Sequence, residues 1–440
     1  MTAIDDLMTA TTATQSWKRV QIKDIYLALY DGPHATPKPA SEGAVFLGIK
    51  NITEDGKLDL SDIRYISEED FPKWTRRVLP RPGDMVFTYE ATLNRYAIIP
   101  EGFRGCLGRR LALIRPNLKK VDTRFLFYYF FGENWRKTIA TNLIFGSTVD
   151  RIPLTNFPKF EISLPPLPIQ RKIAAILSAY DDLIENNTRR IEILEEMGRS
   201  LYREWFVNFR FPGHEQVKMV DSELGLIPEG WEVKTIGDAC LVGDGAHAKI
   251  KRQTSGVLYL TCKNLKEGGL DLSKVDYISE EDYNKYFRDN SKALTKLKAD
   301  DVIFSIIGTI GEPYLVKPKD YFGISSSVAI LRRNKSVLST NYLYYWVKSH
   351  IFQNALYGIK GGVAQGYVSL EMIKSLPLYY PELSLQNQFD VHASSILSLI
   401  EVLTQKNANL RKTRDLLLPK LISGEIDVEN LDINIREIAA

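Results

Sequence analysis

One long internal repeat restricts the fold of this chain more than any other feature. The hexapeptide YISEED stands at residues 65–70 and again, letter for letter, at residues 277–282. The similarity extends in both directions, with offsets between copies of 212 to 217 residues, through these pairs of segments: 31–36 and 244–249, 59–70 and 271–282, 165–170 and 381–386. A period of this length indicates two duplicated domains rather than a solenoid of short repeats.

Each copy mixes patterns that are typical of strands and of helices. Apolar runs that are β-branched or alternate predict strands at 85–89, 111–114, 302–307 and 327–331. The aromatic segments 125–131 and 342–347 are interpreted as buried helices, with strands as the alternative. Within the hexapeptide, Ser67 and Ser279 each stand three residues before an aspartate, which resembles a capping box and predicts that a short helix starts there. The sequence therefore predicts that each copy is an α+β domain.

A heptad pattern follows each copy. Apolar residues recur at spacings of four and three over 173–201 and over 389–417, which is typical of a coiled coil. Asn187 and Asn407 interrupt the two seams, and we predict an antiparallel pairing in which they face each other. About 40 residues per helix would make a rod of about 60 Å. The alternative is two ordinary amphipathic helices, each packed on its own domain.

Composition restricts the class of protein. A formal net charge of +3 neither requires nor excludes a nucleic-acid partner. Three cysteines without CxxC spacing fit reduced thiols in a cytosolic protein better than disulfides or a zinc site. Residues 1–15 have neither a basic start nor an apolar stretch, so no signal peptide is expected, and no run of about 18 apolar residues predicts a membrane span.

The sequence lacks the common catalytic motifs. It contains no phosphate-binding G-x-x-x-x-G-K-[ST] loop, no H-E-x-x-H, no G-x-S-x-G and no N/D-P-P-Y/F tetrapeptide of adenine methyltransferases. The glycine-rich segments 308–311 and 361–366 are interpreted as turns. His34 and His247 share a repeated D-G-x-H-A loop, and we interpret them as loop-stabilising hydrogen-bond partners rather than metal ligands.

Several segments together resemble one known family. They are DGPHATP (31–37), GDMVFT (83–88), SIIGTIG (305–311), LPPLPIQRKIAAIL (164–177), SLYREWFVNF (200–209), DSELGLIPEGWEV (221–233) and LLLPKLISGEI (416–426). In this order and in duplicate they resemble the DNA-specificity subunit of type I restriction–modification systems, over nearly the whole chain. One departure is TYEATLNRYAI (88–98), where the second copy has the more typical SIIGTIGEPYL, so we expect this loop to be remodelled in the first copy.

The resemblance implies an α+β fold with two duplicated target-recognition domains separated by an antiparallel two-helix coiled coil, related by a pseudo-twofold axis. The expected divisions are a flexible arm (1–16), target-recognition domain 1 (17–163), coiled-coil helix 1 (164–212), a linker (213–230), target-recognition domain 2 (231–378), coiled-coil helix 2 (379–423) and a tail (424–440).

The resemblance also implies a function. Each domain would read one half of an asymmetric bipartite site on double-stranded DNA, and the coiled coil would fix the spacer. Two methyltransferase (modification) subunits and restriction/translocase subunits would be the partners. This chain would bind no cofactor, because S-adenosylmethionine and ATP would bind to those partners. The expected partner-binding residues are Trp205, Phe206, Leu417 and Leu421, and no membrane contact is expected.

Candidate DNA-binding residues are basic, polar or aromatic and lie where the copies differ, apart from Thr309 in the GTIG segment. They are Arg76, Arg77, Tyr89, Asn94, Arg95, Arg109, Arg110, Lys249, Lys251, Arg252, Thr309, Gln365 and Tyr367. Basic side chains can neutralise phosphates, and arginine can pair with guanine. For any one of these cations, a solvated charged surface is the competing interpretation. The hexapeptide is interpreted as scaffold, since an acidic segment repels phosphates and a base-reading one would have diverged.

Two other function classes remain to be weighed against a non-catalytic DNA-reading subunit. A self-contained DNA enzyme would need a methyltransferase or nuclease motif that the sequence lacks. A coiled-coil protein-interaction adaptor without DNA specificity, which binds protein or glycan, would lack the steep salt dependence of DNA binding.

Overall fold

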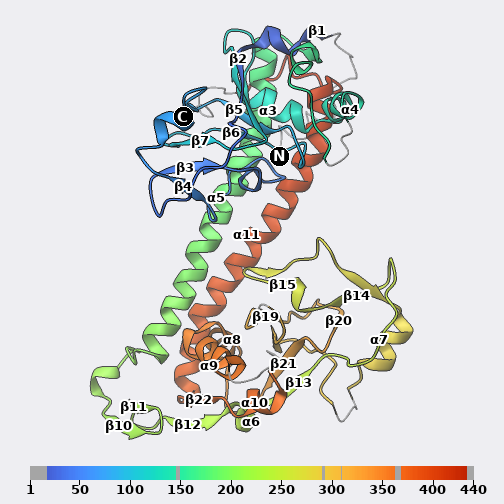
Figure 1. Ribbon diagram of the computed structural model, residues 1–440. Coiled ribbons are helices and arrows are strands. Elements are labelled where there is room, and N and C mark those ends of the chain that lie inside the picture. Colours follow the sequence, from blue (N-terminus) through green and yellow to red (C-terminus); the bar gives the residue numbers. More distant parts are fainter. Residues whose placement is uncertain (1–16, 145–148, 290–292, 309, 362–367, 434–440) are drawn as a thin grey trace. The chain divides into compact units, whose positions relative to one another are not determined.

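The computed structural model describes residues 17–144, 149–289, 293–308, 310–361 and 368–433. The chain divides into two compact units, of which unit 1 combines two segments that are distant in sequence and unit 2 is one continuous stretch (Figure 1). Unit 1 comprises Met1–Asn187 and Gln405–Ala440, and unit 2 comprises Thr188–Thr404. No helix among the described residues is long and apolar enough to cross a membrane.

Unit 1 contains a four-stranded and a three-stranded sheet. The four-stranded sheet is antiparallel throughout, in the order β2 (Tyr26–Asp31), β8 (Leu111–Pro116), β5 (Met85–Thr88), β6 (Tyr96–Ile98). The three-stranded sheet has the order β4 (Arg64–Ile66), β3 (Ala44–Leu47), β7 (Gly105–Leu107), with β3 antiparallel to β4 and parallel to β7. A separate pair joins β1 (Lys18–Gln21) to β9 (Glu161–Leu164).

Unit 2 repeats this topology strand for strand. Its four-stranded sheet has the order β13 (Cys240–Asp244), β21 (Val328–Arg333), β18 (Val302–Ser305), β19 (Pro313–Leu315). Its three-stranded sheet has the order β17 (Asp276–Ile278), β14 (Val257–Leu260), β20 (Phe322–Ile324), again with one antiparallel and one parallel pairing. The pair β12 (Glu232–Thr235) and β22 (Pro377–Tyr380) corresponds to β1 and β9. The predicted duplication is therefore confirmed at the level of topology.

The remaining described strands are short. They are the hairpin β10 (Met219–Ser222) and β11 (Gly225–Pro228), and the hairpin β15 (Leu265–Lys266) and β16 (Gly269–Leu270). Short helices accompany the sheets: α2 (Phe71–Trp74), α4 (Glu133–Thr141), α6 (Ile236–Ala239), α7 (Glu280–Tyr286), α9 (His350–Gly361) and α10 (Leu370–Lys374).

The predicted aromatic segments are helices that fill the two cores. They form α3 (Thr123–Phe131) in unit 1 and α8 (Thr340–Lys348) in unit 2. Asp122 caps α3 by accepting a hydrogen bond from the amide of Phe125, and Ser339 caps α8 in the same way. Burial of large rings supplies most of the hydrophobic stabilisation in such cores.

Equivalent buried polar groups hold each unit together. Asp84 receives two hydrogen bonds from the guanidinium of Arg115, at 2.8 and 2.7 Å, and Asp301 receives the same two from Arg332 at the same distances. Both aspartates are buried. A buried carboxylate requires such a bidentate partner, because its desolvation is otherwise uncompensated.

The repeated hexapeptide is scaffold in both units. Ser279 caps α7, with its hydroxyl oxygen accepting a hydrogen bond of 3.0 Å from the amide of Asp282. In unit 1 the hydroxyl of Ser67 accepts the corresponding bond from Asp70, but the helix begins only at Phe71. The prediction of a helix start is therefore confirmed for the second copy and wrong for the first, where Pro72 follows and the residues before it form a turn.

Two long helices follow the predicted heptads: α5 (Leu167–Phe206) and α11 (Leu383–Ser423). Within unit 1 the side-chain amide of Asn187 donates to the carbonyl oxygen of Asn407 at 2.9 Å, and Arg414 pairs with Asp181. Residue numbers therefore rise along one helix as they fall along the other, which confirms the antiparallel pairing. Within unit 2 the ring of Phe389 packs on those of Tyr202 and Trp205.

Candidate nucleic-acid interface

The repeated D-G-x-H-A loop is held by its histidine. A hydrogen bond of 3.0 Å joins the imidazole of His34 to Asp31, and one of 2.7 Å joins His247 to Asp244. Burial raises the pKa of Asp244, and the neighbouring His247 opposes this shift. The interpretation of these histidines as loop-stabilising partners is confirmed. No group of three or more His, Cys, Asp or Glu side chains that could hold a metal ion occurs among the described residues.

Several of the predicted DNA-binding arginines are held by carboxylates. The pairs are Arg77 with Asp31, Arg95 with Glu54, Arg110 with Glu90 and Arg252 with Asp276. Arg252 also lies over the ring of Tyr259, with its guanidinium carbon 3.9 Å from the ring centroid. Pairing fixes the direction of each guanidinium but reduces the charge that it offers to a phosphate.

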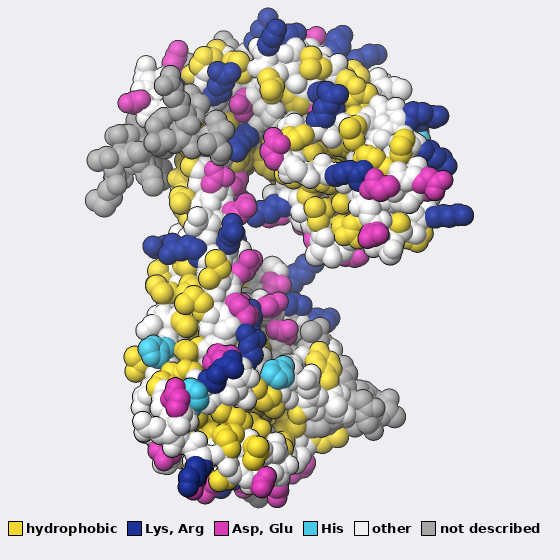
Figure 2. Space-filling view, turned by 90° about the vertical axis from the view of Figure 1, so that its left-hand side faces the viewer, with side chains coloured by type: hydrophobic (Ala, Val, Ile, Leu, Met, Phe, Trp, Pro, Cys, Tyr) yellow, Lys and Arg dark blue, Asp and Glu magenta, His cyan; other side chains and the backbone are white. Residues whose placement is uncertain are grey.

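Four other predicted cations are exposed. Arg76, Arg109, Lys249 and Lys251 take part in no ion pair among the described residues. On the face drawn in Figure 2, lysine and arginine side chains are interspersed with acidic and hydrophobic ones. The four exposed cations named above can neutralise phosphates, as the sequence predicts.

The polar and aromatic members of the predicted DNA-binding set divide into three groups. The prediction that Tyr89 binds DNA is wrong, because its side chain is only 6% exposed and lies in the core of unit 1. Burial also raises the pKa of Tyr89. Asn94 is half-buried, and its carbonyl oxygen accepts a hydrogen bond of 3.2 Å from the hydroxyl of Tyr96. Thr309, Gln365 and Tyr367 lie outside the described residues.

The loop between β5 and β6 was expected to be remodelled, but it keeps the length of its counterpart and two of its positions of positive φ. The loop has seven residues (89–95), as does its counterpart between β18 and β19 (306–312). Ala91 and Asn94 adopt φ angles of 68° and 59°, where Gly308 and Gly311 have 75° and 87°. The sequence comparison missed these shared φ angles because glycine, the usual residue at positions of positive φ, is absent from the first copy.

A second pair of equivalent turns carries different chemistry. The three residues between β7 and β8 end in Arg109 and Arg110, and those between β20 and β21 end in Ser326 and Ser327. The strands on both sides have the same order and direction in the two units. The corresponding turns therefore carry arginines in unit 1 and serines in unit 2, although Arg110 has a φ of 73° and Ser327 does not have a positive φ. Arg110 pairs with Glu90, and the hydroxyl of Ser327 bonds to Ser325 and to the amide of Cys262. Arg109 and Ser326 have no such partners among the described residues.

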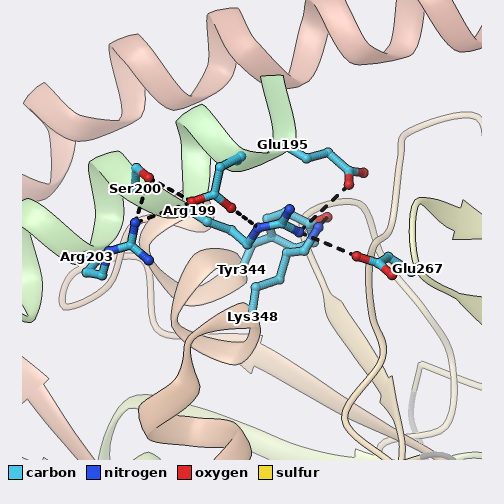
Figure 3. Close-up of polar contacts among 8 residues, drawn as sticks. Glu195, Arg199, Ser200, Arg203, Glu267, Tyr344 and Lys348 are labelled. Atoms are coloured by element: carbon cyan, nitrogen blue, oxygen red, sulfur yellow. Dashed lines mark hydrogen bonds and ion pairs between the residues drawn. The ribbon is translucent and has the colours of Figure 1, made fainter. Parts of the chain in front are cut away.

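In unit 2 a polar cluster ties the β15–β16 hairpin to α5. Guanidinium nitrogens of Arg199 lie 3.1 Å from a carboxylate oxygen of Glu196 and 3.8 Å from one of Glu195, both on the same helix. A third distance, 3.7 Å, joins the guanidinium to a carboxylate oxygen of Glu267 in the hairpin. Tyr344 and Lys348 of α8 lie beside it (Figure 3). The cluster restricts the orientation of the hairpin relative to the helix.

The predicted partner-binding residues are not available to a partner. Trp205, Phe206, Leu417 and Leu421 are between 0% and 7% exposed. The prediction is wrong because the end of each long helix packs on the globular part of its own unit, so the apolar seam there is covered intramolecularly. The exposed apolar residues of the two helices in unit 2 are others, among them Ile193 and Met197 on α5 and Leu399 and Val402 on α11.

Comparison with known proteins agrees with the duplication. Residues 15–196 and 228–412 each match the family model for the type I restriction modification DNA specificity domain. The putative type I restriction enzyme MjaX specificity subunit of Methanocaldococcus jannaschii is 26% identical over 431 residues, which cover 94% of this chain and 95% of the relative. The EcoBI specificity subunit of Escherichia coli is 20% identical over 371 residues, covering 79% of this chain and 74% of the relative.

The fold has a counterpart among solved structures. The crystal structure of a type I restriction-modification S subunit from M. genitalium matches with a TM-score of 0.56 and 15% identity, and the match covers 92% of this chain and 96% of that one. At this identity the likeness concerns the fold alone. The structural match, the two matches to the family model and the match to the MjaX relative each extend over most of this chain.

Proposed function

The chain belongs to the family of type I restriction–modification DNA specificity subunits, and we propose that it recognises an asymmetric bipartite DNA target, with one half-site for each unit. Specificity subunits are the non-catalytic component of such a complex. One observation carries the proposal: the two units share a topology but differ in the side chains that equivalent turns present. Arg109 and Arg110 in unit 1 stand where unit 2 has Ser326 and Ser327.

The different side chains favour two different half-sites. An arginine can donate two hydrogen bonds to the O6 and N7 atoms of guanine, whereas a serine hydroxyl can donate to or accept from more than one base. A symmetric target would need the same readers in both units. The exposed cations Arg76, Lys249 and Lys251 neutralise phosphates in this proposal and supply affinity without sequence preference.

The long helices set the number of unread base pairs. Helix α5 has 40 residues and α11 has 41, and at 1.5 Å per residue each is about 60 Å long. One turn of DNA spans about 34–36 Å, so helices of this length suit a spacer of several base pairs.

Two modification subunits dock on this chain in the proposal, and restriction subunits join them in the cytoplasm. Ile193 and Met197 on α5, and Leu399 and Val402 on α11, are between 49% and 53% exposed. Each pair is separated by about one helical turn, so each forms an apolar strip that a partner helix can cover. S-adenosylmethionine and ATP bind to the partner subunits and not to this chain.

Sequencing of methylated adenines tests the proposal. Cells that express the chain together with its modification subunit should carry methylated adenines in one bipartite motif, and cells that express the modification subunit alone should not. Replacing Arg109 by serine should change the motif in one half-site only, and replacing Ser326 by arginine should change only the other. A single continuous motif, or two identical half-sites, would contradict the proposal.

A matched deletion tests the role of the helices. Removing residues 188–194 and 400–406 takes one heptad from each helix and leaves Asn187 and Asn407 in place. The deletion also removes Ile193 and Val402 from the apolar strips, so the motif is determined from the DNA fragments that the chain itself selects. The selected motif should keep both half-sites and lose base pairs from the spacer. A change in the half-sites themselves would show that the helices do more than set a distance.

A further inference from the structure

The loop between β5 and β6 and its counterpart in unit 2 have the same length and two matching positions of positive φ, although their sequences differ. In unit 1 Met85 pairs with Ile98 and Phe87 with Tyr96. In unit 2 the strands on both sides of residues 306–312 have the same register. Both loops place positive φ angles at their third and sixth residues. The length of this loop, the register of its flanking strands and its two positions of positive φ are therefore shared by the two units.

Unit 1 keeps this geometry with residues that disfavour it. Ala91 has a φ of 68°, a region in which the Cβ atom of an L-residue is crowded and which glycine adopts freely. The amide of Thr92 donates to the carbonyl oxygen of Glu90 at 3.0 Å across Ala91, which closes a strained three-residue turn. Strain of this kind persists only where the surrounding structure holds it, and strained residues cluster at ligand-binding sites.

The strained turn leaves donors unused at its tip. Among the described residues, neither the hydroxyl of Thr92 nor the amide of Leu93 has a hydrogen-bond partner. In unit 2 the amide of Ile310, which occupies the position of Leu93, likewise has no partner among the described residues. A hydroxyl followed by a free amide next to a residue of positive φ is a suitable group for binding an anion.

The charges of the loop are not shared. Arg95 and Glu312 occupy the same position with opposite charge, and Glu90 corresponds to Ile307. What the two loops share is their length, the two positions of positive φ and the residue type at Thr92, since the sequence has threonine at 309 as well. Two units that read different half-sites share only one kind of DNA contact, the sugar–phosphate backbone, because phosphates carry no sequence information.

We propose that the loop of residues 89–95 binds a DNA phosphate, with the hydroxyl of Thr92 and the amide of Leu93 as donors. This inference rests on the proposed function and adds a contact that positions unit 1 on the duplex without reading a base. Thr92 was missed as a candidate because the sequence comparison treated this stretch as divergent. An ungapped alignment of residues 91–94 with 308–311 places the two threonines together.

Two substitutions of one residue test the donor. Thr92→Val keeps the shape of the side chain and removes its hydroxyl, whereas Thr92→Ser keeps the hydroxyl. With the full chain in its complex with the modification subunits, Thr92→Val should weaken binding to the target by at least about tenfold, because a hydrogen bond to a charged group is lost. Thr92→Ser should bind as the wild type does.

The pattern over DNA sequences separates a phosphate contact from a base contact. Thr92→Val should lower affinity by the same factor for the target and for every single-base variant of the half-site of unit 1. Replacing one phosphate of that half-site by a neutral methylphosphonate should weaken the wild type and cause no further loss in Thr92→Val. Equal affinity of Thr92→Val and wild type, or a changed base preference, would overturn the inference.

The same assay distinguishes this failure from failure of the proposed function. If the wild-type complex binds its target specifically and Thr92→Val behaves identically, only the phosphate contact is wrong. If the wild-type complex shows no preference for any sequence, the proposed function fails, and the inference about residues 89–95 fails with it.

Discussion

The side-chain amide of Asn187 donates a hydrogen bond of 2.9 Å to the side-chain carbonyl of Asn407 in the buried seam between α5 and α11. Asn407 donates in turn to the backbone carbonyl of Ile184 at 3.3 Å. Each polar side chain thus has its partner on the opposite helix, and a shift of register would bury both amides without partners. A polar pair of this kind specifies alignment and contributes less stability than an apolar pair.

Replacing both asparagines by leucine should therefore raise the thermal unfolding temperature, and replacing only Asn407 should lower it. The single substitution leaves the amide of Asn187 buried without its acceptor, which costs about 1–3 kcal/mol. Circular dichroism during heating measures both effects. The double variant should also methylate targets whose spacer differs by one base pair, since its register is less restricted. A double variant less stable than the wild type would count against this account.

Gly198 should resist a substitution that helices normally favour. A Cβ atom at this position of α5 would lie 2.1 Å from the hydroxyl oxygen of Tyr345. In most helix interiors Gly→Ala stabilises by about 1 kcal/mol, but here Gly198→Ala should destabilise by about 1–3 kcal/mol because the ring must move. Gly358→Ala in α9 is the matched control, because no atom lies within 4 Å of its Cβ position. Denaturant unfolding should show opposite signs for the two variants.

Substitution of the buried carboxylates of the sheets should lower the free energy of unfolding far more than substitution of an exposed carboxylate. Asp84→Asn or Asp301→Asn removes the charge that Arg115 or Arg332 faces, and each should cost about 3 kcal/mol. Asp62→Asn, which breaks an exposed pair with Lys50, should cost less than about 1 kcal/mol. Hydrogen exchange should place the loss in the unit that carries the substitution. Equal effects for buried and exposed pairs would refute the assignment.

The three cysteines should differ in reactivity. Burial raises the pKa of Cys106 and of Cys240 to about 12, so both remain protonated near neutral pH, and only the thiolate is nucleophilic. Cys262 is partly exposed. A thiol reagent at pH 8 should therefore modify one cysteine quickly in the native protein and all three in denaturant. Substitution of Cys262 by serine should remove the fast phase.

The sequence was sufficient for features that depend on periodicity or on repetition. The duplication, the aromatic helices and the pairing of Asn187 with Asn407 follow from such patterns. Periodicity identifies the buried face of a helix but not the element that covers it, which is why Trp205 and Leu421 were misassigned to a partner. The ion pairs of Arg77 and Arg95 were not predictable either, because their carboxylate partners stand more than forty positions away.

Two glutamines show how the two duplicated domains could be exchanged between proteins of this family. Gln170 lies at the start of α5 and bonds to the carbonyl oxygens of Lys120 and Pro165 and to the amide of Asp122. Gln386 makes the equivalent bonds at the start of α11, to Val337, Pro381 and Ser339. Each glutamine thus belongs to the domain that precedes it in the chain. In a chimeric subunit joined after the glutamine, the new domain would keep all of its hydrogen bonds to that glutamine. A joint placed before the glutamine would instead combine a foreign domain with a glutamine from the original protein.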